Sequence, residues 1–351
     1  MIDFRYHLVS IVAVFLALAI GIVLGSTELQ GPAYNLLDKT TSKLENELGQ
    51  VSSQRDAAQQ QATEGEMYAQ AVEPVVLHGL LTGQRLLIVT EPGAQSSVVS
   101  GISSAALAAG ASITGQINLA TKFFDTSGTT QDSLNQTTLD VAQAAGISLD
   151  SSATYQQQAA QVIASEILVK ATSSSSSTTG KPPADQSTEA STMLQAYAAS
   201  QFLSTTAQPA SPATLVVVVT PQNPPADGSA DQLDQVLVPL VTELAAKGSA
   251  TVVVGSSAGS GAGSPIAVLR SNTVSSQVST VDDADLVFGQ TAAMQALAVG
   301  LAGGKAGSYG FTANGASAIA PSPAPSPSVS PSSTPTSSSS SSSTTKKKVK
   351  K

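Results

Sequence analysis

An unbroken apolar run near the start of the chain is its strongest hydropathy pattern. It extends from Leu8 to Gly25 (LVSIVAVFLALAIGIVLG) without a charge and follows the polar residues Asp3, Arg5 and His7. At ~1.5 Å per residue it is about 27 Å of helix, near the lower end of what crosses a ~30 Å hydrocarbon core. The pattern predicts a membrane anchor over residues 1–26.

Two other interpretations of this run stay open, a buried core helix and a cleaved signal peptide. A polar, Gln-rich segment follows the run, which disfavours a core helix. The small residues Ala17 and Ala19 lie inside the run, so the cleavage site is weak and we expect an uncleaved signal anchor.

The charges that flank the run predict its orientation. Arg5 precedes it, whereas the first charge beyond it is Glu28 and the first cation is Lys39. Positive-inside bias then places the N-terminus in the cytoplasm and the chain from Ser26 onward outside, in a single-pass protein of the cell membrane.

A second helical pattern follows the anchor. We expect Gly31-Pro32 to break the helix and a stalk to occupy residues 31–73, ending before Pro74. Apolar positions recur with the spacing of a coiled coil, although Thr41 and Arg55 interrupt them. The residues expected to interact, between chains or within one chain, are Leu37, Leu44, Leu48 and Val51.

From residue 84 to 320 the pattern alternates between strands and helices. Continuous apolar runs such as RLLIVT and LVVVVT are typical of strands that are buried on both faces. We expect strands at 85–90, 112–119, 215–220, 251–254 and 278–281, and helices at 96–109, 137–145, 155–170, 187–203, 231–246 and 289–301. This order predicts a layered, mostly parallel α/β domain with any ligand crevice at the carboxyl ends of the strands.

Two low-complexity segments interrupt or follow this domain. Residues 173–186 (SSSSSTTGKPPADQ) predict a loop or a disordered insert, and residues 321–351 predict a disordered Pro/Ser/Thr-rich tail. The tail includes the basic cluster Lys346–Lys351, which can meet anionic wall polymer or lipid headgroups or can simply be solvated.

The amino-acid composition argues against several kinds of partner and binding site. The formal net charge is −8, with 4% aromatic residues and no tryptophan, which argues against a nucleic-acid partner. The absence of cysteine excludes disulfides and thiolate metal sites. We therefore expect membrane lipid and other protein chains as the partners.

Catalytic motifs are present only in fragments. Gly255–Gly259 matches GxSxG after a predicted strand, but a hydrolase needs a histidine later in the chain, and the only histidines are His7 and His78. Glycines 259, 261 and 263 do not complete a dinucleotide-binding motif, and neither Gly180-Lys181 nor Gly304-Lys305 forms a Walker A loop. We predict a non-enzymatic protein without catalytic or cofactor-binding residues.

Metal-ligating patterns are also incomplete. Asp282, Asp283 and Asp285 lack the glycine and the distal glutamate of a calcium loop, and we interpret them as helix-capping and turn residues. The four methionines are scattered and the two histidines are far apart, so no copper site or other metal site is predicted.

Several segments resemble one known family. The opening MIDFRYHLVSIVAVFLALAIGIVLGS, the later GQRLLIVTEPG and VSTVDDAD, and the closing GSYGFTANGASAIAP resemble the actinobacterial copper transporter MctB family. The resemblance covers residues 1 to about 321 and implies a channel-forming component of copper efflux in the outer membrane, with copper as a transported ion only.

A SteB-like type within this family implies a different role. It resembles a membrane-anchored coiled-coil protein that acts with a partner of the SteA type to control a peptidoglycan hydrolase during cell separation. One predicted span followed by an α/β pattern supplies neither several spans nor a closed barrel. We therefore expect an extracytoplasmic scaffold that forms homo-oligomers or binds protein partners, with the copper channel as the alternative.

Overall fold

The computed structural model describes residues 4–171, 183–207, 211–222, 230–261 and 263–311. The chain divides into two compact units, residues 1–72 and 73–351. The expected Pro/Ser/Thr-rich tail at 321–351 lies outside the described residues.

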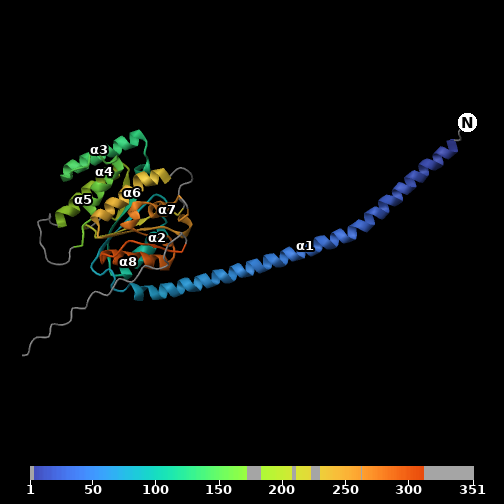
Figure 1. The fold of residues 1–351 in the computed structure, drawn as a ribbon, viewed down its shortest axis with the longest axis horizontal. Coiled ribbons are helices and arrows are strands. Elements are labelled where there is room, and N and C mark those ends of the chain that lie inside the picture. Colours follow the sequence, from blue (N-terminus) through green and yellow to red (C-terminus); the bar gives the residue numbers. More distant parts are fainter. Residues whose placement is uncertain (1–3, 172–182, 208–210, 223–229, 262, 312–351) are drawn as a thin grey trace, which may run out of the picture. The chain divides into compact units, whose positions relative to one another are not determined.

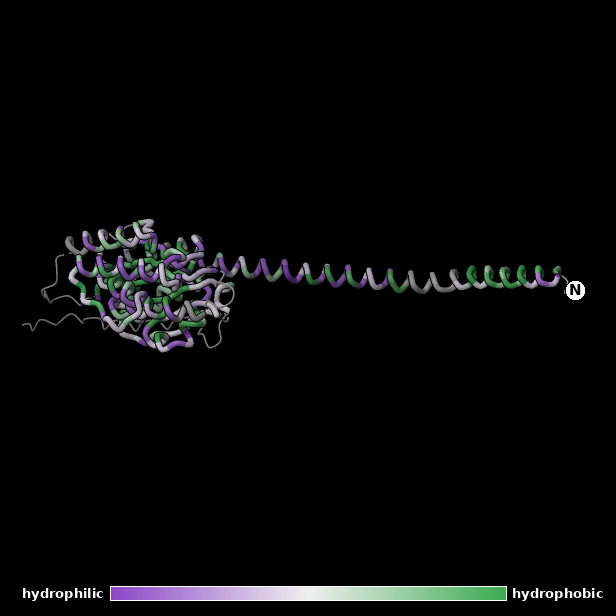
Figure 2. The backbone as a smooth tube through the Cα atoms, turned by 90° about the horizontal axis from the view of Figure 1, so that it is seen from above, coloured by the Kyte–Doolittle hydropathy of each residue, from purple (hydrophilic) through white to green (hydrophobic). Residues whose placement is uncertain are grey.

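One long helix, α1 (Phe4–Leu77), contains the apolar run. Phe4–Gly25 is long and apolar enough to cross a membrane, and none of this segment is covered by protein. Figure 2 shows its hydrophobic colouring at the N-terminal end of the tube. A core helix would be covered, so the structure favours a membrane anchor over that alternative.

The expected helix break at Gly31-Pro32 is wrong, because α1 continues through this pair and also through Pro74. A proline removes one helix hydrogen bond and can bend a helix without ending it. The helix ends at Leu77, two residues before Gly79, whose φ of 77° lies in the left-handed region.

The four residues predicted to form a coiled-coil seam lie on the solvent-exposed surface of α1. Their exposed fractions are 64% for Leu37, 53% for Leu44, 68% for Leu48 and 63% for Val51. The structure contains one chain, so the coiled coil itself stays a prediction. We call these four residues the α1 stripe.

The second unit contains a seven-stranded sheet in the order β3-β2-β1-β4-β5-β6-β7. Every neighbouring pair is parallel except β2 and β3, which confirms the mostly parallel sheet. The strands are β1 (Arg85–Thr90), β2 (Ser112–Leu119), β3 (Leu203–Ala207), β4 (Leu215–Val219), β5 (Ala250–Val254), β6 (Ser279–Val281) and β7 (Ser308–Tyr309).

Helices cover both faces of this sheet (Figure 1). The helices α2 (Ser96–Ala108) and α8 (Val287–Leu301) cover one face, and α4 (Tyr155–Ile167) and α6 (Ala230–Lys247) cover the other. The helices α3 (Gly128–Ala145) and α5 (Pro183–Ala199) both contact α4. The shorter elements are η1 (Thr121–Phe124), η2 (Ser257–Gly259), α7 (Pro265–Ser271) and η3 (Thr273–Ser276).

Two strands and several boundaries differ from the sequence prediction. The edge strands β3 and β7 were not predicted, because β3 is polar (LSTTA) and β7 has only two residues. The helix α3 begins at Gly128 instead of residue 137, and α5 begins at Pro183, so residues 183–186 of the expected insert are helical. Residues 173–182 of that insert lie outside the described part of the chain.

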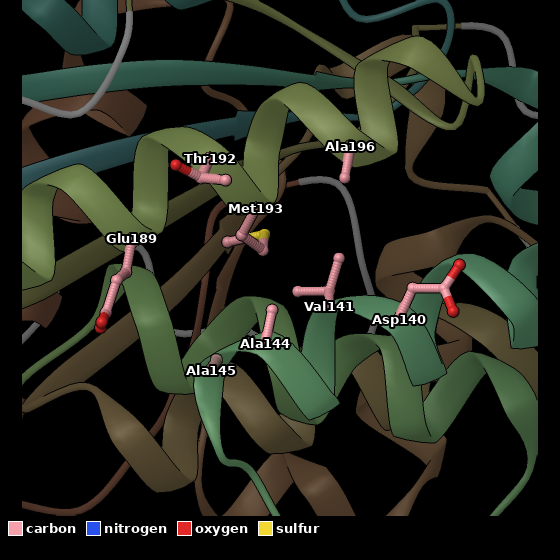
Figure 3. A pocket seen from close by; sticks show the side chains of 8 residues that line it. All are labelled: Asp140, Val141, Ala144, Ala145, Glu189, Thr192, Met193 and Ala196. Carbon is pink, nitrogen blue, oxygen red and sulfur yellow. The ribbon is translucent and has the colours of Figure 1, made fainter.

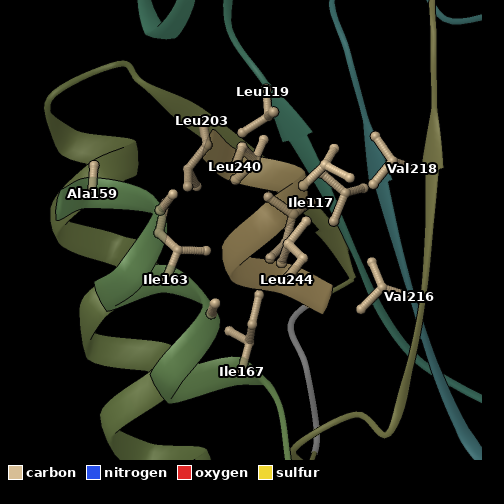
Figure 4. Close-up of a cluster of buried hydrophobic side chains, with 14 of the residues drawn as sticks. Ile117, Leu119, Ala159, Ile163, Ile167, Leu203, Val216, Val218, Leu240 and Leu244 are labelled. Carbon is tan, nitrogen blue, oxygen red and sulfur yellow. The ribbon is translucent and has the colours of Figure 1, made fainter. Parts of the chain in front are cut away.

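Two hydrophobic cores explain why the central strands have no polar face. Leu87 and Val89 of β1 pack into one core, whereas Leu86 and Ile88 of the same strand pack into the other. Figure 4 shows the first core, in which Ile163 of α4 and Leu244 of α6 meet residues of the sheet. Helices on both faces therefore require continuous apolar strands, as in other parallel sheets.

Candidate functional site

The carboxyl ends of the central strands are where a parallel α/β sheet usually binds ligands. β1 connects to β2 on one side, and β4 connects to β5 on the other, so the strand order reverses between β1 and β4. Glu91 follows β1, Thr220 follows β4, Gly255 follows β5 and Asp282 follows β6. The fold therefore brings four loops that are distant in sequence to one edge.

The loops after β1 and β4 are joined by hydrogen bonds at the reversal point. The Glu91 amide donates to the Val219 carbonyl at 2.9 Å, and the Gln222 amide donates to the Gly93 carbonyl at 3.4 Å. The side-chain amides of Gln95 and Gln222 also pair. Gly93 has a φ of 87°, and a Cβ there would lie 3.2 Å from Pro221 Cβ. The loops after β1 and β4 are thus held against each other at the reversal point.

Glu91 is a buried carboxyl group with a raised pKa at this edge. Its side chain is 4% exposed, and Oε1 has no hydrogen-bond partner among the described residues. Burial raises the pKa of Glu91 to about 8, because desolvation disfavours the charged form. The group is therefore largely protonated at pH 7 and can donate a hydrogen bond or release a proton as the pH rises.

Asp282 forms a buried ion pair with Arg270. Its Oδ2 accepts a hydrogen bond from Arg270 Nη1 at 2.7 Å, and the two side chains are 0% and 11% exposed. The same guanidinium donates to Thr280 Oγ1 and to the Tyr309 carbonyl, both at 2.9 Å. Arg270 therefore connects α7 to β6 and β7.

The other two aspartates also hold backbone segments. Asp283 Oδ2 accepts from the Phe311 amide at 2.5 Å, and Asp285 Oδ1 accepts from the Ser257 amide at 2.9 Å. These side chains hold segments that are distant in sequence, and the N-cap of α8 is Leu286 without a side-chain cap hydrogen bond, so the expected helix-capping role of the aspartates is wrong. In the described part of the chain, no group of three or more His, Cys, Asp or Glu is placed to hold a metal ion.

The GxSxG motif does not meet His78, the histidine closer to the sheet in sequence. Ser257 lies at the carboxyl end of β5, where its hydroxyl donates to Asp285 Oδ2 at 2.9 Å. His78 follows α1 and precedes β1, at the amino end of the parallel strands. The two residues thus lie at opposite edges of the sheet and do not form a nucleophile–base pair.

The sequence-predicted interaction residues and the structural site lie in different units. Arg5, Leu8 and Gly25 of the anchor and the α1 stripe all belong to α1. Sequence reasoning did not single out Glu91 or the Arg270–Asp282 pair. A glutamate between a buried strand and Pro-Gly was the available signal for Glu91. No local pattern links Arg270 to Asp282, because the contact depends on the packing of α7 against β6.

Comparisons with known proteins give one consistent result. The family model described as "Copper transport outer membrane protein, MctB" matches residues 1–321. Proteins named "Copper transporter MctB" from Mycobacterium bovis and Mycobacterium tuberculosis are each 27% identical over 324 residues, which is 91% of this chain and 99% of theirs. The similarity includes the anchor, the rest of α1 and the α/β unit.

Proposed function

The chain belongs to the MctB family, and from this membership we propose that it is a membrane-anchored component of copper transport in the cell envelope. The match over residues 1–321 carries the proposal, because it includes both the membrane helix and the α/β unit. Copper is the cargo in this proposal and not a resident cofactor, and the protein acts without enzymatic chemistry.

The proposed placement follows from the anchor. Phe4–Gly25 spans the cell membrane once, with Arg5 on the cytoplasmic side and the α/β unit outside. The alternative is the outer membrane, which the description of the matching family model names. Cell fractionation separates the two placements, because an uncleaved anchor keeps the protein with inner-membrane markers.

The described residues contain one candidate span, so transport requires assembly. A single helix encloses no water-filled path across a membrane, whereas the helices of several copies can enclose such a path. The α1 stripe offers the contact surface, since four exposed apolar side chains lie at coiled-coil spacing just beyond the membrane segment. We propose that homo-oligomers form through Leu37, Leu44, Leu48 and Val51.

A second candidate function is an envelope scaffold of the SteB-like type, which recruits a protein partner of the SteA type during cell separation. The observation in its favour is that Thr41 interrupts the α1 stripe and Arg55 follows it at the next seam position. Polar residues at seam positions weaken self-association and favour a particular partner helix.

Matched variants of α1 test the transport proposal and discriminate the two candidates. Leu44→Asp with Leu48→Asp places charges in the stripe, and Asn46→Asp with Ser53→Asp adds the same charge on the opposite side of the helix. In a deletion strain under copper stress, we expect the control variant to restore normal copper content and the stripe variant to fail. Purified wild-type protein should also conduct in planar bilayers.

Other results would change the assignment. Normal copper content in the deletion strain together with no conductance would contradict copper transport. Co-purification of a wall-hydrolase regulator that is lost only in the stripe variant would then support the scaffold. Recovery of self-oligomers alone would contradict the scaffold.

A further inference from the structure

A groove between α3 and α5 is lined by apolar side chains with carboxylates on either side. Its volume is about 270 Å³, near the lower limit of the ~300–1,000 Å³ of small-molecule sites. Val141 and Met193 are buried in its floor. We call it the α3–α5 groove; it is lined by Asp140, Val141, Ala144, Ala145, Glu189, Thr192, Met193 and Ala196.

The two carboxylates lie on opposite sides of this apolar floor. Figure 3 shows Asp140 on α3 and Glu189 on α5 with Ala144, Val141 and Met193 between them. Asp140 is solvent-exposed and accepts a hydrogen bond from Gln136 Nε2 at 2.9 Å. The arrangement suits an apolar side chain that is flanked by cations on both sides.

The surrounding helices strengthen this charge pattern. The sequences of α3, α4 and α5 contain five acidic residues and neither lysine nor arginine. The acidic residues are Asp132, Asp140, Glu166, Asp185 and Glu189. A basic segment is therefore attracted to this side of the α/β unit.

The chain itself contains a segment with the complementary pattern. Residues 346–351 read KKKVKK, in which Val349 stands between lysines and no acidic residue occurs. We propose that this segment binds in the α3–α5 groove of its own chain, with Val349 against Val141 and Met193 and the lysines beside Asp140 and Glu189. Lysine stems can cover the remaining apolar surface while their ammonium groups stay in water.

The length of the intervening chain permits this contact. Lys346 lies about 35 residues beyond Phe311, and a chain of that length reaches from ~30 Å as a coil to ~110 Å when extended. An α/β unit of about 240 residues has a radius of gyration of ~18 Å. The segment can therefore reach the groove from any point on the unit's surface.

Cysteine crosslinking tests the proposal in the full-length protein, because the chain has no cysteine of its own. Ala144→Cys in the groove is combined with Val349→Cys in nanodiscs, and diamide is added as the oxidant. The control pairs Val349→Cys with Leu107→Cys, which is 61% exposed on α2 over the other face of the sheet. We expect the groove pair to form an intramolecular disulfide about tenfold faster than the control pair.

Charge variants show whether the groove is recognised. Asp140→Asn should slow the crosslink about threefold, because an exposed ion pair contributes that order of affinity. Asp132→Asn, on the same helix but not in the groove lining, should slow the crosslink by less than Asp140→Asn does. A synthetic KKKVKK peptide should compete better than KKKSKK.

Three results would overturn the proposal. Equal rates for the groove and control pairs would show that the segment does not prefer the groove. An unchanged rate in Asp140→Asn would remove the charge recognition. A product that forms only between two chains would replace the proposed intramolecular occupant with a second copy.

Discussion

Replacing Glu91 by glutamine should stabilise the α/β unit, and by more as the pH rises. Burial raises the pKa of Glu91 from its ordinary value of 4.5 to about 8, so the folded protein retains a proton that the unfolded chain releases. As far as Glu91 is concerned, the free energy of unfolding of the wild type is highest below pH 4.5 and falls progressively as the pH rises to about 8. Glutamine has nearly the same shape and does not ionise.

The magnitude follows from the two pKa values. One pKa unit corresponds to ~1.36 kcal/mol, so ionisation of the unfolded chain costs the wild type about 3 kcal/mol at pH 7 and at most about 5 kcal/mol above pH 8. Between pH 5.5 and 8.5, the amount by which the free energy of unfolding of the variant exceeds that of the wild type should grow by about 3 kcal/mol. The glutamine should also lower the free energy of unfolding of the variant by ~1 kcal/mol at every pH, because its buried amide lacks a full set of hydrogen-bond partners.

Urea unfolding of the full-length protein in detergent measures this difference. Tyrosine fluorescence reports on the core, because Tyr197 is fully buried. The exposed control Asp132→Asn should change the free energy of unfolding by less than ~0.5 kcal/mol at every pH. The reasoning would be refuted if the free energies of unfolding of Glu91→Gln and the wild type differed by the same amount at every pH in this range.

Three further predictions concern packing in the same unit, each measured by urea unfolding against the wild type. Arg270→Ala leaves buried Asp282 without its guanidinium and should cost ~3–5 kcal/mol; a loss below 1 kcal/mol would show that the pair is not needed. Gly310→Ala should cost more than Gly303→Ala, since both have positive φ but only a Cβ at residue 310 would overlap an Asp282 carboxylate oxygen; equal losses would contradict that overlap. Leu244→Ala should cost ~2–5 kcal/mol in the core of Figure 4, and a neutral change would contradict its burial.

The sequence was sufficient for the elements with strong periodic patterns. The apolar anchor and the central strands β1, β4 and β5 were predicted because each buries, or exposes to lipid, a continuous apolar run. The parallel arrangement followed from the alternation of strands with helices.

The remaining features depend on tertiary context. The continuous helix through Gly31-Pro32 overrides a local breaker signal, and the edge strand β3 is too polar to be recognised without β2 beside it. The raised pKa of Glu91 results from its burial in the folded chain. The Arg270–Asp282 pair requires the packing of α7 against β6 and β7.

Copper content of a deletion strain tests the central claim most directly, that the anchored protein takes part in copper transport. The strain is complemented with the full-length chain, or with a chain in which residues 1–25 are replaced by a cleavable export signal, and cell copper is measured by mass spectrometry under copper stress. We predict excess copper in the deletion strain, rescue by the full-length chain and no rescue by the unanchored chain. Normal copper content in the deletion strain, or full rescue without the anchor, would contradict the account.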